Sequence, residues 1–326
     1  MRSALLIVVL VGVVALTGCV DASDDVEPVV VEGELEIHHI NVGQADSTLL
    51  ITPEGETILI DTGDWRQGGS DVIRYLAAHD IQRIDHLIGT HGHADHIGGH
   101  AAIIRQFETQ HDGIGAVYDS GVPHTTQTYE NYLDAVEEYD VELLVVEEGD
   151  ELPIGDDNVS GLIVNPPAEE RNDNLHFNSV AAVFEFGDVR YLITGDIETD
   201  AETRLVDEWS DELDVDVYQA GHHGSSTSSS PAFMHQVSPD VAIISSDFES
   251  QYGHPHDETL VDFADRKIET YWTAVHGDIV VTTDGSEIDV ETTEQFSTDA
   301  KELLDAKRGG ASPSVWSPNP TAQVIG

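Results

Sequence analysis

The chain has 326 residues, of which 40% are hydrophobic, and its 63 acidic residues against 13 Lys and Arg give a formal net charge of −50 at pH 7. This apolar fraction excludes a disordered acidic chain, and the length suits one large domain, with no change of composition near the middle to mark a second. The acidity is typical of an extreme halophile's protein and disfavours a protein that follows the nucleic-acid backbone with basic side chains, without excluding DNA as a ligand.

The first residues predict export. An apolar run over residues 4–16 is too short to span a bilayer comfortably and fits the hydrophobic part of a signal peptide. Cys19, the only cysteine, lies where lipoproteins are lipidated, so residues 1–18 are interpreted as a signal peptide with a lipobox. An uncleaved anchor and an ordinary secretory signal are the alternatives. With residues 19–33 as an acidic tether, we expect a domain on the extracellular face of the cell membrane, held by a lipid on Cys19.

The first half of the domain is predicted to alternate strands and helices. Apolar and alternating runs predict strands at 34–42, 48–52 and 57–61, and helical spacing follows at 70–78. A strand at 84–88 leads into a histidine-rich loop and a helix from 97 to about 106. A short strand at 116–118 and a helix at 129–139 complete this half.

The second half is predicted to form a second sheet. Strands are expected at 141–146, 159–164, 179–186 and 189–194, then a helix at 201–209, strands at 215–220 and 241–245, a helix at 258–265 and a final strand pair within 271–281. This order predicts an α/β fold over residues 34–295, an αβ/βα sandwich of two mixed sheets with helices outside. Residues 296–326 are expected to hold a terminal helix, at 298–307, and a disordered tail.

The loop after the strand at 84–88 carries the densest group of candidate metal ligands. His91, His93, Asp95 and His96 lie within six residues. Imidazole and carboxylate are donors that Zn²⁺ and similar ions prefer, and in an extended loop residues two apart point the same way, so His91 and His93 can bind one ion. Asp95 and His96 project elsewhere and can hold a second ion. The spacing therefore predicts a binuclear site.

The sequence His-x-His-x-Asp-His at 91–96 resembles the metal signature of the metallo-β-lactamase superfamily. Segments 40–47, 58–63, 192–196, 221–225 and 252–256 resemble the ordered motifs of the hydrolase domain of ComEC-type competence proteins and their free-standing relatives. The resemblance implies the αβ/βα sandwich of that superfamily, two divalent metal ions, Zn²⁺ or Mn²⁺, and hydrolysis by metal-activated water. It does not give the substrate, because one fold serves many reactions.

Two aspartates that follow apolar strands are assigned to this site. Asp196 comes after the strand at 189–194 through Gly195 and matches the aspartate that bridges both ions in the family, with a plain turn aspartate as the alternative. Asp61, in the segment 61–63, is expected by resemblance to orient imidazoles through hydrogen bonds rather than to bind metal.

The segment 221–225 places two more imidazoles directly after a strand, beside glycines that admit a substrate close to the backbone. One of them is expected to bind the second ion with Asp95, His96 and Asp196. Sequence does not decide which; we favour His222 as the ligand and His223 as the group that contacts a substrate oxygen or donates a proton. Ser225 is placed near the substrate but not as a nucleophile, since serine is common in loops.

The first ion is predicted to lack the further histidine that many superfamily members add, because no histidine fits that place cleanly. Asn178 lies in a segment, 177–180, that resembles a ComEC-type block, and it could supply an amide oxygen or hydrogen-bond a phosphate. An oxygen-rich first site would tolerate Mn²⁺ better than a site of three imidazoles. His176 is the competing residue, interpreted as a surface histidine.

The segment 252–256 contributes a candidate on the substrate side of the site. By resemblance, His254 holds a non-bridging phosphoryl oxygen or protonates the leaving group, and a proline-containing turn with incidental histidines is the alternative. The catalytic candidates are therefore Asp95, Asp196, His223 and His254.

These residues predict a binuclear metal-dependent hydrolase that acts outside the cell on a phosphodiester of DNA or nucleotides. One alternative keeps the site and changes the substrate to a small phosphoester, a lactone or another ester. The other is a non-catalytic accessory lipoprotein that passes a ligand or DNA to a membrane channel. We expect a monomer, with such a channel as the candidate protein partner.

Overall fold

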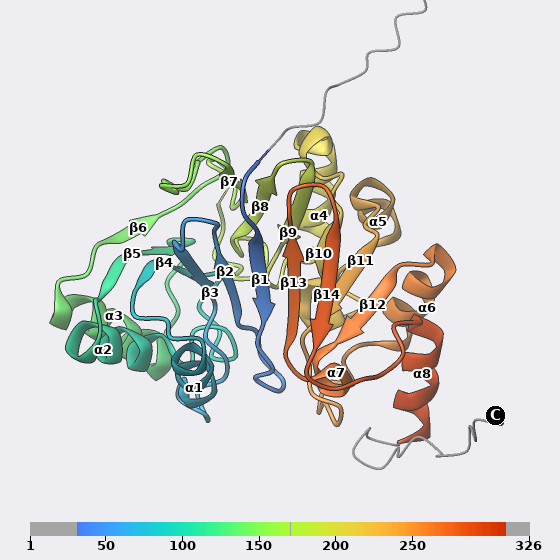
Figure 1. Cartoon of the computed structure of the whole chain (residues 1–326), viewed down its shortest axis with the longest axis horizontal. Coiled ribbons are helices and arrows are strands. Elements are labelled where there is room, and N and C mark those ends of the chain that lie inside the picture. The colour runs from blue at the N-terminus through green and yellow to red at the C-terminus, as the bar shows by residue number, and fades with distance from the viewer. Residues whose placement is uncertain (1–30, 170, 311–326) are drawn as a thin grey trace, which may run out of the picture.

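A computed structural model describes residues 31–169 and 171–310, in which two β-sheets pack face to face with helices on both outer sides (Figure 1). The predicted signal peptide with Cys19, most of the predicted tether and the predicted tail beyond residue 310 lie outside the described residues. Among the helices that are described, none combines the length and apolar character needed to cross a bilayer.

The first sheet contains eight strands: β1 (Leu35–His39), β2 (Thr48–Ile51), β3 (Thr57–Ile60), β4 (Ile84–Gly89), β5 (Ile114–Asp119), β6 (Leu143–Val145), β13 (Ile279–Thr283) and β14 (Ile288–Thr292). Their order across the sheet is β14-β13-β1-β2-β3-β4-β5-β6. Pairing is antiparallel from β14 to β3 and parallel from β3 to β6. The carboxyl ends of β3 and β4 therefore meet at one edge, where Asp61 and the histidine-rich loop follow.

The second sheet contains six strands: β7 (Val159–Asn165), β8 (Ala181–Phe186), β9 (Val189–Ile193), β10 (Val217–Gln219), β11 (Val241–Ile244) and β12 (Glu269–Trp272). Their order is β12-β11-β10-β9-β8-β7, and β9 to β12 run parallel. Asp196 follows β9 and His222 follows β10, so the parallel arrangement brings these side chains to the same edge.

The core has three layers because side chains alternate along each strand. In β2 and β3, Leu50, Ile58 and Ile60 face the other sheet, whereas Leu49 and Leu59 face the helices. The first sheet is covered by α1 (Ser70–Ala78), α2 (His100–Gln110) and α3 (Gln127–Tyr139). The second is covered by α4 (Thr199–Glu208), α5 (Pro231–Val237), α6 (Asp257–Arg266), the single turn α7 (Thr273–His276) and α8 (Ala300–Gly309), on the opposite side of the molecule (Figure 1).

The predicted αβ/βα sandwich is confirmed, but two strand assignments were wrong. The strand predicted at 141–146 is β6, which pairs with β5 in the first sheet and not with the second sheet. The predicted pair within 271–281 is not a pair, because β12 belongs to the second sheet and β13 to the first. Strand periodicity identifies a strand but not its partner, since pairing is decided by chain segments far away in the sequence.

The helix predicted from residue 97 begins later, at His100. Residues 94–99 form turns, in which Gly98 and Gly99 lie against the backbone of residues 62–65. A Cβ atom on Gly98 would lie 2.1 Å from the backbone nitrogen of Trp65, so this close approach requires glycine. The helices α5 and α7 and the strand β14 were not predicted, nor were the short 3-10 turns at 210–212 and 221–224.

Candidate metal centre

The histidine-rich loop at 91–96 is held on both sides by segments that follow other strands of the first sheet. Trp65 N donates to Ala94 O at 2.9 Å, Thr62 N donates to His96 O at 2.7 Å, and Asp46 N donates to Asp95 O at 3.2 Å. These backbone bonds fix the directions in which the loop's side chains point. A site built on such a supported loop is preorganised before any ligand binds.

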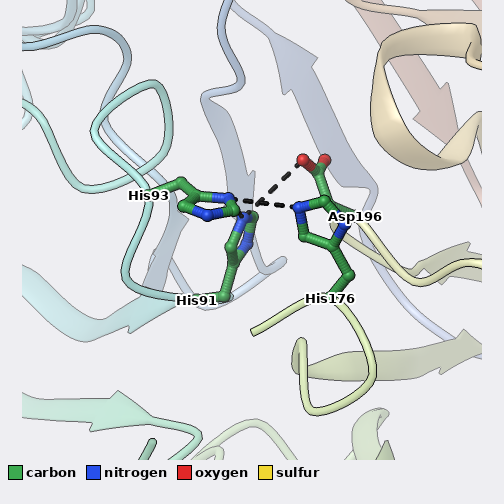
Figure 2. Close-up of side chains that lie close together, drawn as sticks. All are labelled: His91, His93, His176 and Asp196. Atoms are coloured by element: carbon green, nitrogen blue, oxygen red, sulfur yellow. Dashed lines mark hydrogen bonds and ion pairs between the residues drawn. The ribbon is translucent and has the colours of Figure 1, made fainter. Parts of the chain in front are cut away.

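The first group, named here the outer cluster, consists of His91, His93, His176 and Asp196, whose side chains point toward one another (Figure 2). Each contributes one ligand atom, and these atoms lie within 4.8 Å of one another. His176 Nε2 lies 3.3 Å from His93 Nδ1, and His91 Nε2 lies 3.6 Å from Asp196 Oδ2. Ligands of a tetrahedral Zn²⁺ at about 2.0–2.1 Å stand roughly 3.3 Å apart, so this spacing fits one divalent ion.

The second group, the inner cluster, consists of Asp46, His96, Asp196 and His223, all buried. Asp46 Oδ1, His96 Nε2, Asp196 Oδ1 and His223 Nε2 lack hydrogen-bond partners. Buried polar atoms are almost always paired, and atoms that converge without a hydrogen-bond partner, as His96 Nε2 and Asp196 Oδ1 do at 3.2 Å, suit a cation held between them. The donor set of imidazole and carboxylate therefore fits a second divalent ion.

Both imidazoles of the inner cluster are oriented from behind. His96 Nδ1 donates to Asp61 Oδ2 at 2.7 Å, and the same carboxylate accepts from Thr90 N at 2.9 Å and Thr90 Oγ1 at 2.7 Å. His223 Nδ1 donates to the Ser245 carbonyl at 3.0 Å. In each ring Nδ1 therefore carries a proton, which leaves Nε2, the nitrogen that points into the inner cluster, available to a metal ion.

Asp196 belongs to both clusters. Its Oδ2 faces His91 Nε2 and its Oδ1 faces His96 Nε2. One carboxylate would therefore be available to two ions, which is the role that the resemblance implies for Asp196. Asp95 lies at the rim, with Oδ2 3.5 Å from His223 Nε2, outside both groups of converging ligand atoms.

The two histidines after β10 take different places, and the structure puts His223 rather than His222 in the inner cluster. His222 Nε2 lies 3.5 Å from Asp196 Oδ2, and its Nδ1 lies 3.5 Å from Glu198 Oε1, beside His176. Both residues adopt left-handed backbone conformations, with φ of 51° and 56°. Two adjacent left-handed residues send their side chains in directions that a strand pattern does not predict.

His176 and Asn178 lie on one loop but have different surroundings. Asn178 is buried, and its Nδ2 donates to the carbonyls of Asn172 at 2.9 Å and Asn174 at 2.7 Å, so its amide braces the loop that carries His176. His176 is the residue that joins the outer cluster. The sequence offered little to distinguish it from a surface histidine, whereas Asp46 lies inside the recognised segment 40–47 and was open to detection there.

An open cleft of about 570 Å³ lies over the outer cluster. His254 lines it and is 6% exposed, with its ring 5.6 Å from that of His222 and its Nδ1 3.3 Å from Gln44 Nε2. Ser225 does not line the cleft, and its hydroxyl lies 3.0 Å from Thr227 Oγ1, within hydrogen-bond distance. The cleft is lined by His93, Ala94, Asp95, His124, Thr126, His176, Asp196, His222, His223, Tyr252, His254 and His256.

Burial and charge divide the imidazoles into two sets. Burial lowers the pKa of His93 to about 4 and places the pKa of His91 well below its usual value, so both are neutral ligands. Burial also opposes the charged form of His96 and His223, but neighbouring aspartates raise the pKa of each well above its usual value. The pKa of Asp196, which burial alone would raise, is held well below its usual value by His96 and His223. Metal binding at the inner cluster therefore displaces protons.

Comparison with known proteins agrees with this geometry. The family described as the Metallo-beta-lactamase superfamily matches residues 40–246. The chain is 30% identical to "ComE operon protein 3" of Bacillus subtilis (strain 168) over 245 residues, or 70% of this chain and 30% of that protein. It is 28% identical to "Competence protein ComA" of Neisseria gonorrhoeae over 250 residues, or 74% of this chain and 31% of that protein. The chain thus spans about a third of the length of these relatives.

Among solved structures, the chain is similar to Igni18, described as a novel metallo hydrolase from the archaeon Ignicoccus hospitalis. The TM-score is 0.48 at 13% sequence identity, with 76% of this chain and 98% of that chain covered.

Proposed function

We propose that the chain, which belongs to the metallo-β-lactamase superfamily, is a binuclear metal-dependent hydrolase that cleaves a phosphodiester of DNA or nucleotides. The observation that carries the proposal is the pair of clusters that share Asp196. Two divalent ions, Zn²⁺ or Mn²⁺, would supply Lewis acidity and an activated water there. The word "competence" in the name of the Neisseria relative favours DNA among phosphodiesters.

The residues around the cleft suit a phosphoryl group. Burial lowers the pKa of His254 to about 3, with further lowering by the charges of His223 and His222, so the ring is neutral. Gln44 Nε2 donates to His254 Nδ1, which places the remaining ring proton on Nε2. His254 therefore serves as a neutral hydrogen-bond donor to a phosphoryl oxygen or to the leaving alkoxide.

A second candidate keeps this site and takes a small phosphoester, a lactone or another ester as substrate. The net charge of −50 favours it, because a polyanion approaches an acidic surface against electrostatic repulsion. None of the residues that line the cleft over the outer cluster is Lys or Arg.

We also propose that the domain works at the outer face of the cell membrane, held by a lipid on Cys19. The sequence around Cys19 supports this location. Because the relatives are about three times longer than the matched region, a membrane channel is a candidate partner.

The test is digestion of linear and circular DNA by the whole chain in molar KCl with Mn²⁺ or Zn²⁺, beside a nitrophenyl phosphodiester and a nitrophenyl carboxylic ester. His93→Ala removes one ligand of the outer cluster, and His235→Ala is the matched control because His235 is an exposed histidine on α5. We expect phosphodiester cleavage that His93→Ala abolishes and His235→Ala preserves.

Phosphodiester cleavage that survives in His93→Ala would show that the metal centre is not required for the reaction. Turnover of the carboxylic ester alone, by a folded and metal-loaded protein, would replace the proposed substrate with the second candidate.

A further inference from the structure

A second cavity adjoins the cleft over the metal centre. It measures about 300 Å³ and shares Ala94, Asp95 and Tyr252 with that cleft. Residues 64–67 also line it, and the hydrogen bond from Trp65 N to Ala94 O ties this segment to the histidine-rich loop. A molecule whose phosphodiester lies over the outer cluster can therefore extend into this cavity past Asp95.

The cavity is lined by both of the exposed large aromatic side chains in the part of the chain that the structure describes. Of the large hydrophobic side chains that are exposed among the described residues, only Trp65, at 54%, and Tyr252, at 59%, are aromatic, and both line it. The others are aliphatic and lie on β6 and α6. Single exposed apolar residues need no explanation, but two aromatic rings in one cavity next to a candidate active site indicate a ligand with a flat face.

Arg66 lies beside Trp65 in the wall of this cavity. The Arg66 guanidinium carbon lies 5.2 Å from the centre of the Trp65 ring, and Arg66 Nη1 donates to Asp64 Oδ2 at 2.9 Å. Arg66 is the only Lys or Arg that lines either cavity, and Asp64 partly neutralises it. This wall is therefore suited to stacking rather than to following a chain of phosphates.

The polar groups of the cavity suit the edge of a nucleobase. Gln67 and Gln251 line it, as do three aspartates, and a side-chain amide carries both hydrogen-bond donors and an acceptor. Bases are recognised by just this combination of an aromatic face and amide contacts to the edge.

We propose that this cavity is a nucleobase subsite, in which Trp65 and Tyr252 stack with the base next to the phosphodiester being cleaved. The inference rests on the proposed phosphodiester hydrolysis and narrows its substrate to single-stranded nucleic acid, because the bases of a duplex are stacked on each other and present no free face. Stacking also does not depend on long-range charge, so it supplies affinity to a protein whose surface repels phosphates.

The test measures binding separately from hydrolysis. Fluorescence anisotropy gives the Kd of the whole, Mn²⁺-loaded chain for a short oligothymidylate with hydrolysis-resistant phosphorothioate linkages, for the same strand with abasic residues, and for a duplex. Trp65→Ala, Trp65→Phe and Tyr252→Ala are compared with Val261→Ala, a control at an exposed apolar residue on α6. Both aromatic residues are exposed, so their replacement spares the core.

We expect the intact strand to bind more tightly than the abasic strand and the duplex. Trp65→Ala should weaken binding of the intact strand by about 5-fold to 100-fold and bring the ratio between abasic and intact strands close to one. Trp65→Phe should restore most of that ratio, and Val261→Ala should keep it.

Equal binding of intact and abasic strands by the unsubstituted chain, or a ratio that Trp65→Ala and Tyr252→Ala leave unchanged, overturns the subsite. Duplex binding as tight as that of the single strand overturns it as well. Base-dependent binding without any hydrolysis would leave the subsite standing and refute the hydrolase. Phosphodiester hydrolysis that depends on neither Trp65 nor Tyr252 would support the hydrolase and refute the subsite.

Discussion

The inner and outer clusters share Asp196 but differ in what surrounds their other ligands. In the inner cluster every ligand is buried, and the rings of His96 and His223 are fixed from behind by the Asp61 carboxylate and the Ser245 carbonyl. In the outer cluster His93 and His176 are only partly buried and line the open cleft. These surroundings suit the inner cluster to retention of an ion and leave the outer cluster the more open of the two to a substrate.

Replacement of the shared carboxylate should have the largest effect, because it acts on both clusters. Asp196→Asn keeps the shape but removes the charge that faces His91 and His96. We expect the loss of both ions after dialysis, measured by atomic emission, and a fall in phosphodiester hydrolysis of at least about 100-fold. Asp188→Asn, in the exposed β8–β9 turn, is the control. Full metal content and full activity in Asp196→Asn would show that Asp196 is not a ligand shared by the two ions.

Replacing in turn the two histidines that follow β10 tests which of them is a ligand of the inner cluster. His223→Ala removes an inner ligand, so affinity for the tighter ion should fall by more than about 100-fold, whereas His222→Ala should change it by less than about 10-fold. Competition with a metal-sensitive chelator measures both. The reverse order of effects would show that His222, the ligand favoured by the sequence, binds the inner ion.

Removing the support behind His96 should have a smaller effect on the same cluster. Asp61→Asn keeps the left-handed backbone, which asparagine tolerates at φ 58°, but weakens the hydrogen bond to His96 Nδ1. Affinity for the tighter ion should fall by about 10-fold to 100-fold while the weaker ion is retained. Asp80→Asn, at an exposed left-handed position, is the matched control. An equal loss at both ions would mean that Asp61 supports the whole edge of the sheet rather than His96.

The last prediction concerns the free energy of unfolding and the buried residue His100, which lies near His96 of the inner cluster. His100 is fully buried on α2, and burial lowers its pKa to about 3, with a further contribution from the charge of His96. The unfolded chain takes up this proton below about pH 6.5, so the free energy of unfolding falls as pH drops from about 6.5 towards 3, by roughly 1.4 kcal/mol per unit.

In metal-free protein, His100→Gln should therefore reduce the loss of unfolding free energy between pH 6.5 and pH 5 by about 2 kcal/mol. Denaturant titrations at the two pH values measure the difference between variant and parent. His235→Gln, at an exposed position, should show the parent's pH dependence. An unchanged slope in His100→Gln would mean that the ring is protonated in the folded chain.

Sequence periodicity was sufficient for the layers of the fold and not for its strand pairing. Leu49 and Leu50 are consecutive apolar residues, which predicts that both faces of the strand are buried, and the structure places one face against the helices and the other against the second sheet. The place of β6 and β13 depends on hydrogen bonds to β5 and β1, which no local pattern encodes. Pairing is a contact between distant segments, and periodicity describes only one segment at a time.

For the metal centre, the sequence by itself determined the ligands that lie close together along the chain. The histidines at 91–96 are recognisable because strand–loop geometry relates neighbours in a predictable way. Only the tertiary structure brought Asp46 and His176 to the centre and put His223 rather than His222 in the inner cluster. These side chains sit in loops with left-handed or irregular backbone, where direction follows from φ and ψ and from packing against distant segments.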